Sequence, residues 1–214
     1  MKFYRHYKNK PYKYLGVVKH SETLEDLVLY KCRYENPTGR VWVRPKDMFF
    51  ENIDLNGKSV PRFEKVNIEF QAHEKVSAEN IQQIAPLIKA SFGEWDENWF
   101  NSTFKNHAKF YLQLAHIDGN PVAFKLGYEL DQWTFYSWLG GVIPEFRGLG
   151  IAYELLTQQH DWCKKQGYRQ VQTKTQNNFK DMLMLDLKNG FDVIDTHLSE
   201  TGALKIVLSK DLQK

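Results

Sequence analysis

The chain has 214 residues and a formal net charge of +3, with 29 Lys and Arg against 26 Asp and Glu. This length allows one medium-sized domain, or a small domain and a larger one. No apolar run approaches the ~20 residues that a membrane-spanning helix needs, and the basic, aromatic start of the chain lacks the apolar segment of a secretory signal. We therefore expect a soluble, cytoplasmic protein with no membrane association.

The net charge is unevenly distributed along the chain. Residues 1–65 hold 14 Lys and Arg against 8 Asp and Glu, which gives +6, and residues 66–214 hold 15 against 18, which gives −3. A basic module beside a mildly acidic one admits an anionic partner such as a nucleic acid. Scattered, solvated lysines on a small domain would account for the same charge, so both interpretations stay open.

Cysteine and histidine spacing gives no indication of a metal. Cys32 and Cys163 fall in different predicted domains, and neither has a partner at metal-ligand spacing. The seven histidines are scattered in the same way. We expect two reduced, buried thiols and no metal ion.

Three short strands are predicted in the first 65 residues, and no long helix. Turn-forming Ser-Glu-Thr and Asn-Pro-Thr-Gly segments separate these strands, which run from Tyr12 to His20, Asp26 to Tyr34 and Arg40 to Arg44. A small, strongly bent antiparallel sheet or barrel is the natural arrangement for them. The segment from Asn56 to Ser59, followed by Pro61, predicts a turn that leads into a second domain near residue 65.

Several short motifs in the same segment match a known family. They are Tyr4-Arg5-His6-Tyr7-Lys8, His20-Ser21-Glu22-Thr23, Leu27-Val28-Leu29-Tyr30, Trp42-Val43-Arg44-Pro45, Met48-Phe49 and Arg62-Phe63. On these residues the segment resembles a small family catalogued as domain of unknown function 1653. The resemblance covers nearly all of residues 1–65, and it implies a separate domain without bringing a known activity.

The second predicted domain, residues 66–214, begins with a strand at Val66 to Phe70 and a helix that Ser77 caps. Pro86 lies inside this helix, where it predicts a kink or a later start. A short aromatic helix, a hairpin and a strand that is apolar on both faces follow, and such a strand belongs in the centre of a sheet. These elements are expected at Trp95 to His107, at Lys109 to His116 with Pro121 to Leu130 around Asp118-Gly119-Asn120, and at Trp133 to Val142.

The most informative stretch runs from Gly140 to Ala152 (GGVIPEFRGLGIA), where a strand stops at a proline and passes through a glycine-rich turn into an amphipathic helix. Such a turn directs backbone N–H groups and a helix N-terminus at one spot, which suits a pyrophosphate. Gly167 is predicted to end the helix. A strand at Gln170 to Gln176 follows, and Asn177-Asn178 comes directly after it. A helical segment from Phe179 to Asn189 is then predicted to end at Gly190-Phe191. The last elements are two paired strands, Val193 to Leu198 and Ala203 to Ser209, around Glu200-Thr201-Gly202.

Arg147, Gly150 and Ala152 fit the pattern Arg/Gln-x-x-Gly-x-Gly/Ala, and the stretch resembles the acyl-CoA-binding motif of the GNAT superfamily of N-acetyltransferases. The order of elements over residues 66–214 is also that of the GNAT core. The resemblance implies an α/β fold, a mixed sheet with helices on both faces, preceded here by a small all-β domain. It implies direct transfer of an acetyl group from acetyl-CoA to a primary amine of a small molecule, peptide or protein.

On the family's template, the turn and helix start bind the diphosphate, and the backbone of the preceding strand binds the pantetheine arm. One strand N–H would polarise the thioester carbonyl as an oxyanion hole. Gly140-Gly141 suits a β-bulge that splays the strands there. The cofactor-binding residues implied are Gly141, Val142, Ile143, Arg147, Gly148, Leu149, Gly150, Ile151, Ala152, and Asn177 or Asn178, although turn initiation alone would explain one asparagine.

The catalytic residues are harder to assign. Many family members carry a tyrosine acid four residues before the Gly-Phe pair, but Asp186 stands at that position here. Burial could raise the pKa of Asp186, water could supply the proton, or Asp186 could be structural. Glu129 is the candidate base, acting directly or through water, and is otherwise an exposed hairpin carboxylate. Ser137 is a candidate for orienting the thioester or the base.

Several alternatives stay open. Trp95, Trp99 and Phe100 fit an acceptor pocket as well as a core. The chain could instead be a non-catalytic acyl-CoA-binding sensor whose basic N-terminal domain binds a nucleic acid or a protein. That domain could also be a substrate-recognition module, with His6, His20, Glu22, Trp42 and Arg44 around a small-ligand site. The sequence does not set the oligomeric state, and a homodimer is one option.

Overall fold

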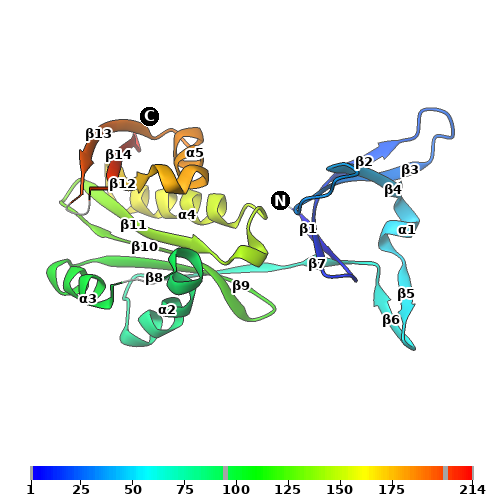
Figure 1. Cartoon of the computed structure of the whole chain (residues 1–214), viewed down its shortest axis with the longest axis horizontal. Coiled ribbons are helices and arrows are strands. Elements are labelled where there is room, and N and C mark those ends of the chain that lie inside the picture. Colours follow the sequence, from blue (N-terminus) through cyan, green and yellow to red (C-terminus); the bar gives the residue numbers. More distant parts are fainter. Residues whose placement is uncertain (1, 94–95, 200–201, 214) are drawn as a thin grey trace. The chain divides into compact units, whose positions relative to one another are not determined.

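The computed structural model describes residues 2–93, 96–199 and 202–213. The chain forms two compact units: residues 1–68 with 148–150, and residues 69–147 with 151–214 (Figure 1). The first unit is built mainly from β-strands, whereas the second combines a large sheet with helices.

A five-stranded antiparallel sheet forms the first unit, in the order β4-β3-β2-β1-β7. The three strands predicted here are confirmed as β2, β3 and β4, while β1 and β7 were not predicted. The strands are β1 (Phe3–His6), β2 (Lys10–Lys19), β3 (Asp26–Cys32), β4 (Val41–Pro45) and β7 (Phe63–Val66).

A short helix and a hairpin connect β4 to β7. They are α1 (Lys46–Phe50), β5 (Asn52–Leu55) and β6 (Lys58–Pro61). Asn56 and Gly57 have φ angles of 55° and 79°, the conformation of a two-residue hairpin turn. The prediction that this segment leads into the second domain was therefore wrong, because the turn closes a hairpin and the chain returns to pair β7 with β1.

Aromatic rings fill the interior of the first unit. Phe49 is fully buried and stacks on Phe63 with ring centroids 4.1 Å apart. Tyr4 and Tyr30 meet Phe49 at 5.2 and 5.4 Å. Because α1 carries Phe49 into this cluster, the short helix anchors the link between the two edges of the sheet.

A seven-stranded mixed sheet forms the second unit, in the order β13-β14-β12-β11-β10-β9-β8. β11 and β12 run parallel, and β11 lies in the centre as predicted. The pairs β9–β10, β10–β11, β12–β14 and β13–β14 are antiparallel. The strands are β8 (Ile68–His73), β9 (Phe110–Ile117), β10 (Asn120–Glu129), β11 (Thr134–Val142), β12 (Gln170–Gln176), β13 (Asp192–Leu198) and β14 (Leu204–Asp211).

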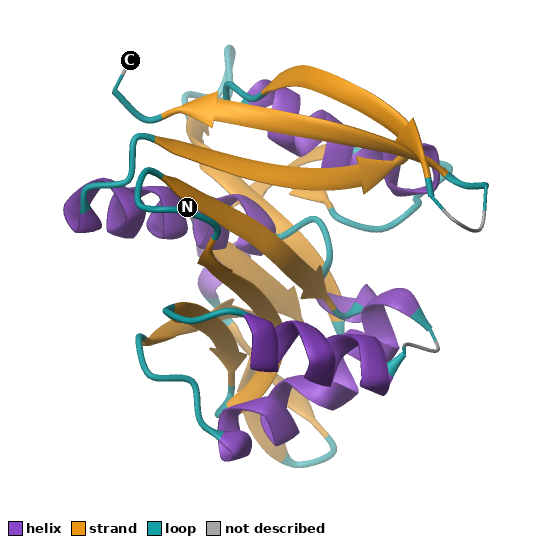
Figure 2. Cartoon of the chain, turned by 90° about the vertical axis from the view of Figure 1, so that its left-hand side faces the viewer, coloured by secondary structure: helices purple, strands orange, loops and turns teal. Residues whose placement is uncertain are grey.

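Helices cover both faces of this sheet (Figure 2). α2 (Ala78–Phe92) and α3 (Glu97–Asn106) bury residues in a core on one face, and α4 (Ile151–Gln166) and α5 (Lys180–Lys188) pack on the other. Ser77 caps α2, as predicted, and the structure adds a capping box that Ser77 shares with Asn80. α2 begins at Ala78 and contains Pro86, so the predicted alternative of a helix that starts only later, because of this proline, is wrong. Trp95, predicted to open the second helix, lies outside the described residues.

Candidate functional site

The central strand β11 separates from β12 partway along its length. The two strands pair only at Thr134 to Tyr136. Thr173 of β12 donates a further hydrogen bond from Oγ1 to the carbonyl oxygen of Ser137 at 2.8 Å. Among the described strands, β11 then continues to Val142 with β10 as its only paired neighbour. One edge of β11, from Trp138 to Val142, is therefore open inside the sheet, and we call it the open edge.

Strand parity decides which backbone groups face the open edge. The N–H of Ile143 donates to the carbonyl oxygen of Val122 at 3.0 Å, so Ile143 and Gly141 direct their backbone polar groups toward β10. Gly140 and Val142 alternate with them and face the open edge. Of the three strand residues predicted to bind the pantetheine arm, Val142 therefore faces the open edge, while Gly141 and Ile143 direct their N–H groups toward β10. Gly140, which was not among the three, also faces the open edge.

A β-bulge lies at the point of separation, but not where it was predicted. The register between β10 and β11 shifts between Leu126 and Tyr128, where Gly127 faces both Ser137 and Trp138. Gly140 and Gly141 pair in regular register with β10. The prediction of a bulge at these two glycines was therefore wrong.

The two glycines instead give room to neighbouring side chains. A Cβ atom on Gly141 would lie 2.6 Å from Cβ of Ser91, in α2. A Cβ atom on Gly140 would lie 2.9 Å from Cδ and 3.5 Å from Nζ of Lys125, in β10. The Oγ of Ser91 is buried and has no hydrogen-bond partner among the described residues. Ser91 therefore offers an unpaired hydroxyl beside the open edge. Nothing in the sequence signalled this, because a single serine in a helix is common.

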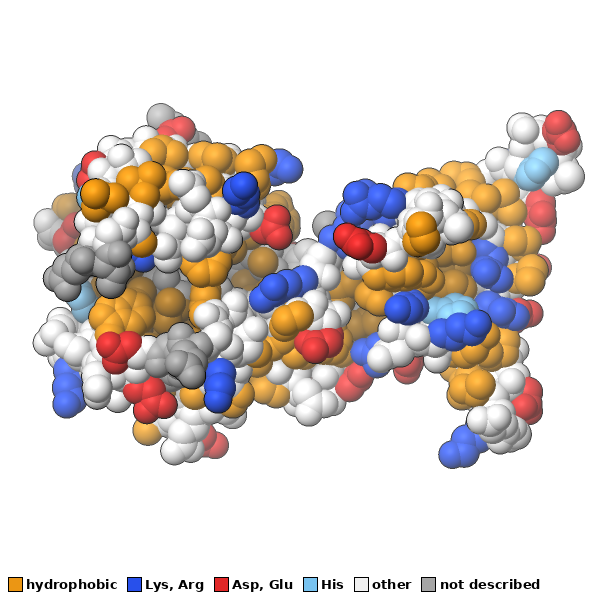
Figure 3. Space-filling model, in the orientation of Figure 1, with side chains coloured by type: hydrophobic (Ala, Val, Ile, Leu, Met, Phe, Trp, Pro, Cys, Tyr) orange, Lys and Arg blue, Asp and Glu red, His pale blue; other side chains and the backbone are white. Residues whose placement is uncertain are grey.

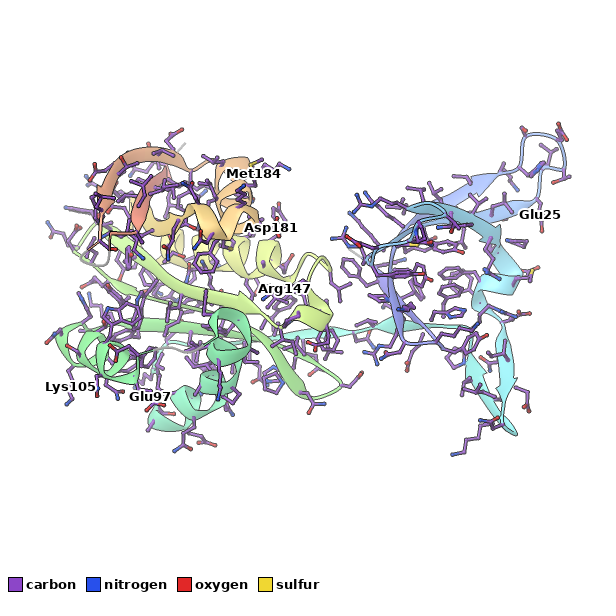
Figure 4. All side chains as sticks on the ribbon, in the orientation of Figure 1. Glu25, Glu97, Lys105, Arg147, Asp181 and Met184 are labelled. Carbon is purple, nitrogen blue, oxygen red and sulfur yellow. The ribbon has the colours of Figure 1, made fainter. Side chains whose placement is uncertain are left out.

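β11 leads through a 3-10 turn, η1 (Pro144–Phe146), into a glycine-rich loop and α4. Arg147 begins the loop (Figure 4) and donates from Nε to the carbonyl oxygen of Val142 at 2.9 Å. Gly148 and Gly150 have φ angles of 77° and 78°, which favour glycine. In the described chain, the N–H groups of residues 148–150 donate to no backbone carbonyl, and those of the first helical turn have no helical acceptor. Adjacent free donors at the positive end of α4 suit an anion.

The segment after β12 meets the end of α2. It forms a 3-10 turn, η2 (Asn177–Phe179), whose Phe179 contacts Phe92 edge to face with ring centroids 5.8 Å apart. Phe92 directly follows Ser91, which lies on Gly141. This contact therefore places the turn that carries the exposed Asn177 and Asn178 next to the end of α2.

Buried polar side chains collect on the other face of the sheet, under α4 and α5. Ser137 donates from Oγ to Oε1 of Gln159 at 2.7 Å, and Lys210 Nζ lies 3.3 Å from Nδ1 of His160. Such polarity inside a sheet–helix interface is costly unless every group has a partner. We call this group the polar cluster, and its members are Gln113, Lys125, Ser137, Gln159, His160 and Asp186.

Asp186 and Lys125 are the ionisable pair of the polar cluster. Asp186 is 1% exposed, and its Oδ1 has no hydrogen-bond partner within the described chain. Burial raises the pKa of Asp186, and the charge of Lys125 only partly opposes that rise. Burial likewise lowers the pKa of Lys125, against the attraction of Asp186. The sequence missed Lys125, although a lysine that interrupts the apolar run from Val122 to Leu126 was a signal.

Glu129 lies at the other end of β10, where its carboxylate is already engaged. Lys109 Nζ lies 2.6 Å from Oε2 of Glu129, and the Tyr168 hydroxyl donates to the same oxygen at 2.8 Å. The pKa of Glu129 is lowered on balance: partial burial raises it, and the hydrogen bonds from Lys109 and Tyr168 outweigh that effect. β10 pairs Glu129 with Phe135, seven residues before Val142, so Glu129 and the loop lie toward opposite ends of β11.

The aromatic residues considered for the acceptor have different environments. Phe100 is buried and stacks on Trp138 with ring centroids 5.0 Å apart, so it belongs to the core. Trp99 is 49% exposed and meets Trp138 edge to face at 5.2 Å. Trp99 therefore presents an aromatic surface next to the strand that carries the open edge.

The described residues contain no group of three or more His, Cys, Asp or Glu side chains that could hold a metal ion. No helix in that part of the chain combines the length and the apolar character needed to cross a membrane. Both cysteines are free and buried, as predicted.

Two family models match the chain. Residues 78–191, more than half of the chain, match the acetyltransferase (GNAT) family, and residues 2–65 match a protein family of unknown function, DUF1653. The comparison with curated protein sequences gives no match. The chain belongs to the acetyltransferase (GNAT) family, and this membership makes it an acyltransferase.

Solved structures share the fold of the second unit. A GNAT family acetyltransferase from Elizabethkingia anophelis, solved with acetyl-CoA bound, has a TM-score of 0.55 at 19% identity, over 68% of this chain and 98% of that one. The ribosomal-protein-S18-alanine N-acetyltransferase of Escherichia coli has a TM-score of 0.57 at 14% identity, over 67% and 94%. Arabidopsis thaliana Naa50, in complex with the bisubstrate analogue CoA-Ac-MVNAL, has a TM-score of 0.55 at 22% identity, over 67% and 98%.

Acid should destabilise the protein through His160 of the polar cluster. Burial, then the charge of Lys210, lowers the pKa of His160 from 6.5 to about 3. Between these two pH values the unfolded chain binds a proton at this histidine and the folded chain does not. The free energy of unfolding therefore decreases as the pH is lowered, by at most ~1.4 kcal/mol per pH unit. We expect urea unfolding of His160→Gln to show a flatter slope between pH 7 and pH 4 than the wild type.

His197→Gln is the matched control for that measurement, because it removes an exposed histidine from β13. It should leave the slope unchanged. An unaltered slope in His160→Gln would show that His160 does not titrate as its burial requires, whatever the absolute stability of the variant.

Proposed function

We propose that this chain is an acetyl-CoA-dependent N-acetyltransferase that transfers an acetyl group directly to a primary amine. The observation that carries the proposal is the open edge of β11, which ends at a loop and a helix start with free N–H groups. An open strand edge can pair with the amide-bearing pantetheine arm, and free N–H groups at a helix start suit the diphosphate. The acetyl-CoA bound in the similar E. anophelis structure supports this assignment.

Each part of acetyl-CoA then has a proposed partner in the chain. The N–H groups from Gly148 to Ala152 hold the diphosphate, while Arg147 ties the loop to the end of β11. The backbone of Gly140 and the N–H of Val142 pair with the pantetheine arm, since the Val142 carbonyl already accepts from Arg147. Asn177 or Asn178 binds one of the amides of the arm. One strand N–H polarises the thioester carbonyl. Acetyl-CoA supplies the activated acetyl group.

The acceptor is proposed to be a primary amine that approaches over the exposed indole of Trp99, which packs on the buried Trp138. An exposed indole attracts a cationic ammonium before it loses its proton. One similar structure is named for alanine of a ribosomal protein, and another was solved with a bisubstrate analogue of CoA and a peptide. These support a peptide or protein amine, and a small amine fits the same chemistry.

Asp186 is proposed to protonate the departing thiolate. An ionised carboxylate would be a poor acid at neutral pH, but burial raises the pKa of Asp186 and so favours the protonated form. Lys125, whose Nζ lies under Gly140, supplies a further hydrogen-bond donor next to the open edge where the thiolate would form. Ser137 has a positioning role, because its carbonyl and hydroxyl fix β11 to Thr173 and Gln159.

Glu129 is proposed to take the proton of the acceptor ammonium through water. Its lowered pKa keeps the carboxylate ionised, as a base must be, although Lys109 and Tyr168 make it a weak one. Water bridging suits its position, since β10 holds it several residues away from the open edge.

Amine-dependent thiol release tests the proposed reaction. The purified protein is mixed with acetyl-CoA and, in turn, with peptides bearing a free α-amine, peptides bearing a lysine, and small diamines. At least one class should raise thiol release about tenfold or more over the acceptor-free rate, which is the scale expected of real turnover. Peptides with blocked amines serve as the control. Bound acetyl-CoA with no acceleration by any amine would contradict transfer to an amine.

The pH profile of kcat/KM tests the two proposed proton carriers. Asp186→Asn should lower kcat by about 100-fold and remove the fall in rate at alkaline pH, because that fall reports loss of the Asp186 proton. Glu129→Gln should remove the fall at acid pH. Asp181→Asn, on the exposed side of α5 and labelled in Figure 4, is the matched control. A variant that folds and keeps the wild-type profile would exclude its residue from proton transfer.

A further inference from the structure

A set of hydrogen-bond donors surrounds Phe63 in the first unit. The His6 ring packs on Phe63 with ring centroids 4.7 Å apart, and the guanidinium carbon of Arg44 lies 5.8 Å from the centre of the same ring. Arg62 precedes Phe63 in the chain. Figure 3 shows Lys and Arg side chains gathered around a histidine on this unit.

The curvature of the five-stranded sheet brings these residues together. β4 and β7 are its two edge strands, and β1 pairs His6 opposite Phe63. Arg44 of β4 nevertheless lies over Phe63 of β7, so the sheet bends until its edges approach one another. We call the place where they approach the β4–β7 seam, and it comprises His6, Arg44, Arg62 and Phe63.

The hydrogen bonds of the seam are incomplete. Nε of Arg44 is buried and has no hydrogen-bond partner among the described residues. The N–H of Lys8 donates to Nδ1 of His6 at 3.3 Å, which places the proton of the neutral ring on Nε2. Burial, then the charges of Arg44, Arg62 and Lys8, lowers the pKa of His6 to about 4. At neutral pH the seam therefore offers an imidazole N–H and guanidinium groups, all of which are donors.

The charges of the seam are also unbalanced. Arg62 pairs with Glu51, whose Oε1 lies 2.7 Å from Nε and 2.5 Å from Nη2 of the guanidinium. Within the described chain, Arg44 and Lys8 form no ion pair. Stacking on Phe63 alone would explain the position of Arg44, but not the unused Nε or the gathering of like charges around a neutral histidine.

We propose that the β4–β7 seam binds the phosphate group of a phosphorylated ligand. The unpaired charge of Arg44, with the Arg62 guanidinium in the same seam, attracts a phosphate, and guanidinium groups bind phosphate oxygens in pairs. Phe63 supplies an apolar base under the group, and Nε2 of His6 adds a neutral donor. The phosphate belongs either to a small phosphate ester or to the backbone of a nucleic acid, which gives the basic first unit an anionic partner.

The test measures phosphate binding by the full chain without acetyl-CoA. Sodium phosphate, uridine 5′-monophosphate and a ten-nucleotide oligouridylate are each titrated at several salt concentrations by calorimetry. The proton resonances of His6 report the same site in the wild type. An anion beside His6 should raise its pKa by about one unit or more, and Arg44→Gln should weaken binding about tenfold, the scale of one charged hydrogen-bonding group.

Arg40→Gln is the matched control, because it removes the same charge from an exposed position of the same unit. Binding of phosphate or the mononucleotide that Arg44→Gln weakens supports a small phosphate ester. Binding of the oligonucleotide alone, with a steep salt dependence and the same sensitivity to Arg44, supports a nucleic acid. An unchanged His6 pKa with every ligand, or equal losses in Arg44→Gln and Arg40→Gln, would overturn the proposal.

Discussion

The uneven pairing of β11 is the constraint on which the second unit depends. β11 is paired with β10 along most of its length, but with β12 only from Thr134 to Tyr136. Thr173 fixes the point of separation through the carbonyl of Ser137. Because backbone groups inside a protein need partners, the free edge beyond that point calls for an extended ligand with amides of its own. The loop and the start of α4 continue this edge, so one break in pairing positions both the open strand and the proposed diphosphate site.

The polar cluster under α4 has no explanation in stability alone. Lys125, Gln159 and Asp186 occupy positions where an apolar side chain would pack at less cost. Oδ1 of Asp186 and Nε2 of Gln159 have no hydrogen-bond partner in the described residues, and Gly140 leaves room for the stem of Lys125. Ionisable groups with perturbed pKa values beside an open strand are typical of sites that move protons. A buried donor without a partner, Nε of Arg44, likewise distinguishes the β4–β7 seam from an ordinary basic surface.

Local signals made much of the second unit predictable from the sequence. The Asp118-Gly119 turn, the apolar run of β11 and the helix α4, which ends just before Gly167, depend on neighbouring residues, and all three are present. Strand parity and register depend on distant pairings instead. The orientation of Ile143 and the bulge opposite Gly127 were therefore beyond the sequence. Ser91 and Lys125 acquire their importance only because the fold buries them, and the roles of Glu129, Ser137 and Asp186 stay predictions.

Calorimetric titration of acetyl-CoA into the protein tests the central claim most directly. The wild type should bind with a measurable heat, whereas Arg147→Ala combined with Gly150→Trp should not, because the bulky ring closes the loop to the diphosphate. Gly167→Trp is the matched control: its φ angle of 89° resembles the 78° of Gly150, and it lies at the opposite end of α4. It should therefore suffer the same backbone strain and still bind. Failure of the folded wild type to bind acetyl-CoA would contradict the account.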